Sequence, residues 1–227
     1  MVEFDPRFTQ TLYLDTEWYV PPGARTAGTG SLIVNPARGT DALLGGVFVR
    51  EFPLQGRRLP PEEIWGFDLA AEDETLRSVY RLFERAWGEI AGRKAEHPDL
   101  VVVGIGVARF DLPALFTRCL VRQIDRPERL FETFFHTKPV DLADFGAVGG
   151  TPAVRVLYPR TANQLRRARR PGPRKPSGTS VWRMFDEGRF DAIRARTRAE
   201  VEDVIALAHE LLARRPPAAE EREAGSP

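Results

Sequence analysis

The segment Leu12–Tyr19 (LYLDTEWY) has the apolar, aromatic character of a buried strand but carries two acidic residues, Asp15 and Glu17. Side chains alternate across a strand, so residues two positions apart leave the same face with their bases roughly 6.5–7 Å apart. Two carboxylates on an interior strand are costly unless a cation neutralises them. Mg²⁺ or Mn²⁺, which prefer oxygen ligands, would provide this neutralising charge. An edge strand with a solvated polar face is the alternative that this segment leaves open.

The chain of 227 residues is long enough for one domain with a sizeable core, expected at residues 1–213, followed by a polar, proline-rich tail at 214–227 that we expect to be disordered. Its formal net charge of +1 points to no particular partner. The single cysteine, Cys119, excludes an intramolecular disulfide and fits a reducing compartment. No apolar run is long enough to span a bilayer, and the N-terminus lacks a signal-peptide pattern. We therefore expect a cytoplasmic protein without a membrane partner.

The order of apolar segments predicts an α/β fold with a mixed sheet flanked by helices. A continuous apolar run, Leu100–Ile105, predicts a strand buried on both faces, and an apolar stripe from Leu76 to Ile90 predicts a helix before it. Gly- and Pro-rich turns separate three earlier segments that predict an antiparallel meander: Thr11–Tyr19, Ser31–Val34 and Leu43–Phe52. The later elements expected are helices at 112–123, 126–135 and 197–213 and a strand-like or loop element at Val140.

Two further acidic residues lie at positions of interest. Asp111 follows the buried strand in the sequence FDLPAL, where a helix is expected to begin. Its structural alternative is an N-cap, with Pro113 in the first helical turn. Asp203 lies in the last predicted helix, which opens with a capping box formed by Thr197 and Glu200. The structural alternative for Asp203 is a solvated helix face.

In combination these motifs resemble the DEDD superfamily of 3′–5′ exonucleases, which has the ribonuclease H-like fold. The chain is most similar to exonucleases related to the proofreading domain of family B DNA polymerases. The residues that carry the resemblance are Asp15-Thr16-Glu17, Phe110-Asp111-Leu112-Pro113 with Arg118, the stretch Gly172–Val181, and Glu202-Asp203-Val204. The resemblance implies two divalent ions, Mg²⁺ or Mn²⁺, held by Asp15, Glu17, Asp111 and Asp203, and hydrolysis of phosphodiester bonds.

The sequence departs from the family at the residue that positions the attacking water. The family carries a Tyr four residues before the last Asp, or a His five residues before it, and here those positions are Ala199 and Arg198. Gly106 also stands where the family usually has Asn. Two interpretations stay open: a nuclease that uses another base, or a catalytically weakened nucleic-acid-binding module of the same fold.

A basic segment between Arg155 and Lys175 contains eight Lys or Arg residues and no acidic one. Such a segment attracts phosphate backbones, which predicts binding of single-stranded DNA or RNA. The alternative is a solvated loop in an arginine-rich protein, and neither the choice of nucleic acid nor the oligomeric state follows from the sequence. The residues predicted to bind nucleic acid are Arg166, Arg167, Arg169, Arg170, Arg174 and Lys175.

Overall fold

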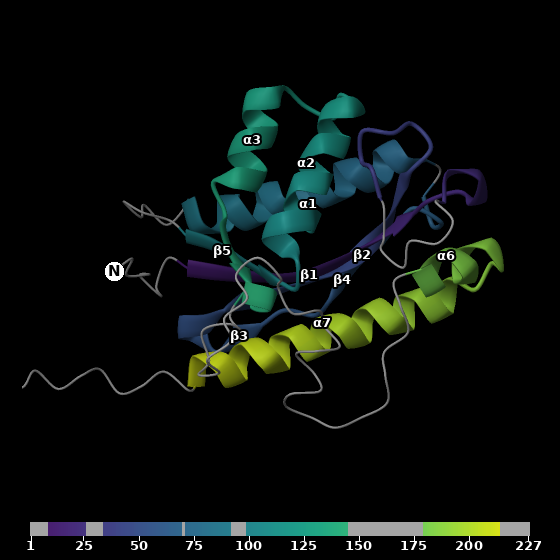
Figure 1. Cartoon of the computed structure of the whole chain (residues 1–227). Helices are drawn as coiled ribbons and strands as arrows, with labels where there is room; N and C mark the ends of the chain where they lie inside the picture. Colours follow the sequence, from purple (N-terminus) through teal and green to yellow (C-terminus); the bar gives the residue numbers. More distant parts are fainter. Residues whose placement is uncertain (1–8, 26–33, 70, 92–98, 145–178, 214–227) are drawn as a thin grey trace, which may run out of the picture.

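The computed structural model describes residues 9–25, 34–69, 71–91, 99–144 and 179–213 (Figure 1). A six-stranded mixed sheet forms its centre, with the order β3-β2-β1-β5-β6 and with β4 paired to β2. β2 is antiparallel to β1, β3 and β4. β5 lies between β1 and β6 and is parallel to both. The strands are β1 (Thr9–Tyr19), β2 (Ala42–Phe52), β3 (Arg57–Arg58), β4 (Glu62–Trp65), β5 (Asp99–Gly104) and β6 (Lys138–Asp141).

Helices cover both faces of this sheet, and β1 is buried between them (Figure 1). Leu12 and Leu14 of β1 pack into the core beneath the first three helices, while Tyr13 packs into the core beneath the last two. The first face carries α1 (Glu72–Ala91), α2 (Leu112–Val121) and α3 (Pro127–Phe135), and the second carries α6 (Thr179–Asp186) and α7 (Phe190–Ala213). This is the mixed α/β architecture expected from the sequence, and it is compatible with a ribonuclease H-like fold.

The elements with strong local patterns match their predictions. α1 begins with three acidic residues, Glu72, Asp73 and Glu74, which suit the positive end of the helix dipole. Its apolar residues Leu76, Val79 and Phe83 are fully buried. The predicted buried strand is β5, and α2, α3 and β6 lie where helices and a strand were expected. None of the described helices is long and apolar enough to cross a membrane.

Two predictions about the order of elements need correction. The last helix, α7, begins at Phe190, seven residues before the predicted start at Thr197, so the capping-box interpretation of Thr197 and Glu200 is wrong. β1 pairs directly with β2, and the further strands antiparallel to β2 are β3 and β4, neither of which was predicted. The helix α6 was not predicted either. Ser31–Val34 lies almost entirely outside the described residues, as does the tail at 214–227.

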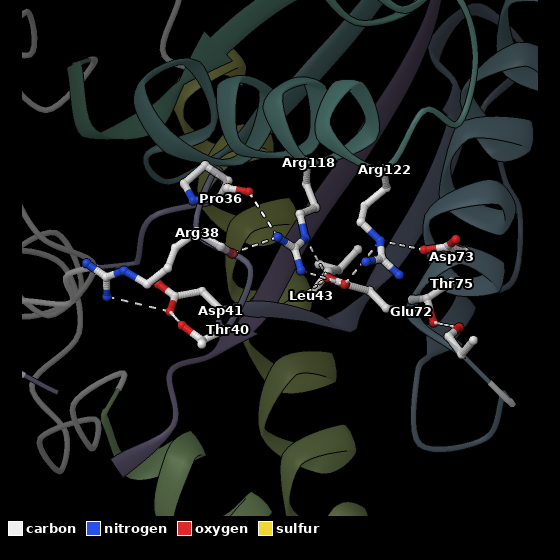
Figure 2. Close-up of polar contacts among 11 residues, drawn as sticks. Pro36, Arg38, Thr40, Asp41, Leu43, Glu72, Asp73, Thr75, Arg118 and Arg122 are labelled. Atoms are coloured by element: carbon white, nitrogen blue, oxygen red, sulfur yellow. Dashed lines mark hydrogen bonds and ion pairs between the residues drawn. The ribbon is translucent and has the colours of Figure 1, made fainter. Parts of the chain in front are cut away.

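A buried ion pair ties α2 to the start of α1 and to the turn before β2 (Figure 2). Arg118 of α2, only 2 % exposed, donates from Nε and Nη2 to both carboxylate oxygens of Glu72, at 2.9 and 2.7 Å. Its Nη1 donates to the carbonyls of Pro36 and Arg38, at 3.3 and 2.8 Å. Glu72 in turn accepts a bond from the backbone N–H of Leu43 at the start of β2. The Arg118 named in the sequence motif therefore holds three segments of the fold together.

Candidate metal centre

Asp15 and Glu17 lie toward the C-terminal end of β1, which is a central strand. β2 and β5 flank β1, so the edge-strand interpretation is wrong. Both side chains leave the face that α7 covers: Glu17 accepts a hydrogen bond from Thr197, and Tyr13, two residues before Asp15, contacts His209. Glu17 is only 8 % exposed, and Asp15 is partly exposed. The two acids therefore lie between the sheet and a helix, in surroundings where a carboxylate needs a partner.

A β-bulge follows the acidic pair. The pairing of β1 with β2 shifts between Glu17 and Trp18, and Gly45, opposite Glu17, adopts a φ of +135°. A Cβ at this position would lie 2.0 Å from the carbonyl oxygen of Ile64, so only glycine fits. Such bulges redirect side chains at the ends of strands. Here the bulge ends the regular alternation directly after Glu17.

Three carboxylates come together between β1 and α7. One oxygen from each of Asp15, Glu17 and Glu200 lies within 4.8 Å of the other two. Opposite oxygens on a single Mg²⁺ are roughly 4.2 Å apart, since each bond is about 2.1 Å long. The group, which we call the carboxylate cluster, therefore has the donor type and the dimensions of a site for one divalent ion.

The helical acid in this cluster is Glu200, whereas the sequence motif indicated Asp203. Asp203 lies on the same helix, partly exposed and about one turn further on, and is not a member of the cluster. Glu200 lies in the interior of α7, because that helix begins at Phe190, and its carboxylate reaches the acids of β1. A metal-binding role for Asp203 stays a prediction.

A guanidinium group is bonded to two members of the cluster. Arg196, one helical turn before Glu200, donates from Nη1 to Oε1 of Glu17 at 2.6 Å and pairs through Nη2 with Glu200 at 3.0 Å. Its side chain is 12 % exposed, and its Nε is buried without a hydrogen-bond partner among the described residues. Thr197 adds a neutral donor, 3.0 Å from the same Glu17 oxygen. The sequence analysis missed Arg196, although its four-residue spacing from Glu200 was the available signal.

Burial raises the pKa of Asp15 well above its usual range, and the charges of Glu200 and Glu17 raise it further. A hydrogen bond between Asp15 and Glu200 acts in the same direction, since two carboxyl groups can share a bond only when one of them carries a proton. The buried Oδ2 of Asp15 has no hydrogen-bond partner among the described residues. A bound cation would satisfy this oxygen and, by favouring the ionised carboxylate, would lower the raised pKa of Asp15. The residues present therefore fit a divalent ion.

Asp111 lies beside the cluster, at the end of a π-helical turn that joins β5 to α2. Its Oδ1 accepts a hydrogen bond from the hydroxyl of Thr16, and Trp18 donates to that hydroxyl from 3.0 Å. Burial raises the pKa of Asp111 to about 6, although the bonds from Thr16 act in the opposite direction. The charge of Asp111 also raises the pKa of Asp15, so the two carboxyls are electrostatically coupled.

The N-cap interpretation of Asp111 is wrong, because its backbone is helical and its side chain makes no capping hydrogen bond. The turn before it contains Gly106, whose φ of +87° lies in the left-handed region that glycine adopts without strain. The N–H of Gly106 donates to Oδ1 of Asp141 at 2.9 Å. Asp141, at the end of β6, is a buried acid that the sequence analysis did not single out, and its charge contributes to the raised pKa of Asp111.

The two positions at which the family carries Tyr or His lie outside the cluster. Arg198, 55 % exposed, donates from Nε to Glu63 at 2.8 Å, and Ala199 is exposed. Neither residue can orient or deprotonate a water molecule beside Asp15. The six basic residues predicted to bind nucleic acid, together with the rest of 145–178, lie outside the described residues.

Comparison with known proteins finds similarity in structure but none in sequence. No protein-family model and no curated protein sequence matches the chain. The fold is similar to that of the family B DNA polymerase from the hyperthermophilic archaeon Pyrobaculum calidifontis, with a TM-score of 0.56 and 18 % sequence identity. The match covers 89 % of this chain and 24 % of the polymerase chain, so this chain spans about a quarter of the polymerase. What the two share at this identity is the fold.

Proposed function

We propose that this protein is a metal-dependent 3′–5′ exonuclease that hydrolyses phosphodiester bonds in single-stranded or frayed nucleic acid. The observation that carries the proposal is the gathering of Asp15, Glu17 and Glu200 within 4.8 Å between a central strand and a helix. The structural neighbour is a DNA polymerase, which supports nucleic acid as the substrate class. The resemblance of the first two acidic motifs to those of DEDD enzymes supports the 3′–5′ direction.

In this proposal Asp15, Glu17 and Glu200 hold a divalent cation, Mg²⁺ or Mn²⁺. The cation, when bound, supplies Lewis-acid activation of the phosphodiester and of water. Asp111, whose pKa of about 6 lies near neutrality, is able to accept a proton beside them. A second ion, which the resemblance implies, needs further carboxylates, and Asp111 and Asp203 are the candidates.

Degradation of end-labelled oligonucleotides tests the proposal. Single-stranded DNA and RNA, labelled at the 3′ or the 5′ end, are incubated with Mg²⁺, Mn²⁺ or EDTA. We expect a metal-dependent ladder that starts at the 3′ end, and a loss on the order of 100-fold or more in Asp15→Asn, because loss of a ligand should cost at least as much as loss of its supporting partners. Binding of the oligonucleotide without cleavage in either Mg²⁺ or Mn²⁺ would refute the proposal that the protein is a nuclease.

A matched pair of variants tests which helical acid takes part. Glu200→Gln and Asp203→Asn each remove one charge from the same helix, about one turn apart. We expect the first to lose cleavage as Asp15→Asn does and the second to keep most of it. The opposite pattern would support the family assignment of Asp203 over the geometry of the cluster.

A second candidate function is a nucleic-acid-binding module without catalysis. Two observations favour it: Arg196 already pairs with two of the three acids, and Arg198 and Ala199 stand in place of the usual Tyr or His. The same assay separates the two functions, since a module binds the oligonucleotide equally with metal and with EDTA and cleaves in neither.

A further inference from the structure

The guanidinium of Arg196 takes up oxygens that a divalent cation would bind. It bridges Glu17 and Glu200, two of the three members of the carboxylate cluster, at 2.6 and 3.0 Å. A cation that bound the same three carboxylates would have to share Glu17 and Glu200 with this group or displace it. Because both carry positive charge, they also repel each other in these largely buried surroundings.

The contacts of Arg196 are less complete than those of Arg118. Arg118 uses all three of its nitrogens on Glu72 and on backbone carbonyls. Arg196 uses Nη1 and Nη2, while its buried Nε has no hydrogen-bond partner among the described residues. Fewer bonds therefore hold Arg196 in place, so its displacement costs less.

Asp15 carries the carboxylate oxygen of the cluster that Arg196 leaves unbonded. Its Oδ2 is buried and has no hydrogen-bond partner among the described residues, so the guanidinium bridges two acids of the cluster and leaves this oxygen without a donor. This oxygen of Asp15 would be available to a cation, whereas at Glu17 and Glu200 the cation would meet the guanidinium of Arg196.

We infer that Arg196 is an internal counter-ion that competes with a divalent cation for Glu17 and Glu200, so that the cluster takes one ion at most and binds it more weakly than the three carboxylates alone would. The inference rests on the metal site of the proposed function. Arg196 thereby acts as a positioning residue that sets the cation affinity of the site.

Calorimetric titration of the metal-free protein with Mn²⁺ tests the inference. Arg196→Gln removes the competing charge and retains an amide that can donate to Glu17, and we expect it to bind Mn²⁺ at least tenfold more tightly than the unaltered protein. Arg198→Gln is the matched control, because it removes the same charge two residues along α7 from a side chain that is paired with Glu63 and exposed. Its Mn²⁺ affinity should equal that of the unaltered protein, and Asp15→Asn in the Arg196→Gln background should abolish the gain.

An Arg196→Gln protein that binds Mn²⁺ no more tightly than the unaltered protein would overturn the inference, as would an equal gain in Arg198→Gln. The stoichiometry of the unaltered protein is a second test that holds even if Arg196→Gln does not fold. Compared with Asp15→Asn, the unaltered protein should bind at most one additional Mn²⁺ per chain, and two additional ions would overturn the inference.

The titration involves no cleavage, so the two proposals can fail separately. If Arg196→Gln binds Mn²⁺ more tightly but the protein shows no nuclease activity, the counter-ion inference holds and the exonuclease proposal is refuted. Metal-dependent cleavage with equal Mn²⁺ affinities in both proteins would uphold the exonuclease and refute the counter-ion.

Discussion

The clusters formed by Arg118 with Glu72 and by Arg196 with Glu17 and Glu200 differ in how completely they are paired. In the first, Arg118 places all three guanidinium nitrogens on acceptors, and both oxygens of Glu72 are bonded (Figure 2). In the second, Arg196 leaves Nε without a hydrogen-bond partner among the described residues, and the same holds for Oδ2 of Asp15. The first cluster joins three segments of the fold, whereas the second lies between β1 and α7 at the candidate metal centre.

This difference indicates what each cluster can do. A buried polar network that is fully paired specifies one arrangement and gains nothing from a further ligand. An incompletely paired network keeps atoms that a ligand can satisfy, at a cost to the stability of the protein without that ligand. Completeness of pairing therefore distinguishes Arg118 from Arg196, although both are buried and both contact glutamate.

Arg118→Met should give the largest loss of stability. The substitution leaves Glu72 buried without its guanidinium and two carbonyls without a donor, which we expect to lower the free energy of unfolding by about 3–5 kcal/mol. Arg122→Met is the matched control, because its side chain is 41 % exposed and its ion pairs with Asp73 and, at 3.9 Å, with Glu72 should contribute less than about 1 kcal/mol. Urea unfolding followed by circular dichroism measures both. Equal losses would show that complete burial and pairing do not distinguish Arg118.

Asp111→Asn should change the dependence of stability on pH. The pKa of Asp111 in the folded protein is about 6, above the ordinary 3.8, so the folded state binds the proton more tightly than the unfolded state does. Stability contributed by this proton is present below pH 4 and is lost as the pH rises through 6, by roughly 3 kcal/mol in the metal-free protein.

The Asn variant cannot take up this proton, and its amide oxygen can still accept the bond from Thr16. In EDTA, the difference in unfolding free energy between the unaltered protein and Asp111→Asn should therefore fall between pH 4 and pH 6.5. A difference that stays constant across this range would show that Asp111 titrates normally.

Arg196→Gln sharpens the comparison through its response to metal. Without a divalent ion we expect a loss of about 1–3 kcal/mol in unfolding free energy, less than for Arg118→Met, because Glu17 keeps its bond from Thr197. Millimolar Mn²⁺ should restore this loss, since an ion that binds only the folded state stabilises it. The same Mn²⁺ should leave Arg118→Met unrestored, and thermal unfolding with and without the ion measures both responses. If Mn²⁺ does not restore the stability of Arg196→Gln, Arg196 stabilises the fold as Arg118 does and does not compete with a cation.

The elements that were predicted from the sequence are those with a local pattern. β1, β5 and α1 each carry an apolar periodicity that does not depend on distant residues, and the spacing of Asp15 and Glu17 places both on one face of β1. The N-terminus of α7 was misplaced because Thr197 and Glu200 imitate a capping box. A sequence signal for the earlier start was Gly188, because glycine commonly follows the C-terminus of a helix. Gly188 lies two residues after the end of α6, and its φ is +69°.

The composition of the site depends on contacts that no local pattern encodes. Arg196 bonds to Glu17 across 179 positions of the chain, and Arg118 bonds to Glu72 across 46. With the start of α7 at Thr197, Arg196 lay before the helix, and the carboxylate of Glu200, although within reach of the site, was assigned to the capping box. Moving the start to Phe190 puts both in the helix interior, and the cluster follows from that placement.

Thr197→Val should produce the smallest effect and tests whether the neutral donor of the second cluster matters. The hydroxyl lies 3.0 Å from Glu17 Oε1 and 3.0 Å from the carbonyl of Ile193, and its single proton can serve only one of them at a time. Valine fills the same buried space, so we expect a loss of about 0.5–1.5 kcal/mol in metal-free protein. Because this hydroxyl orients a proposed metal ligand, Mn²⁺ affinity should also fall, on the order of tenfold. A loss of stability with unchanged affinity would mean that the proton resides on the Ile193 bond and that Glu17 is oriented by Arg196 alone.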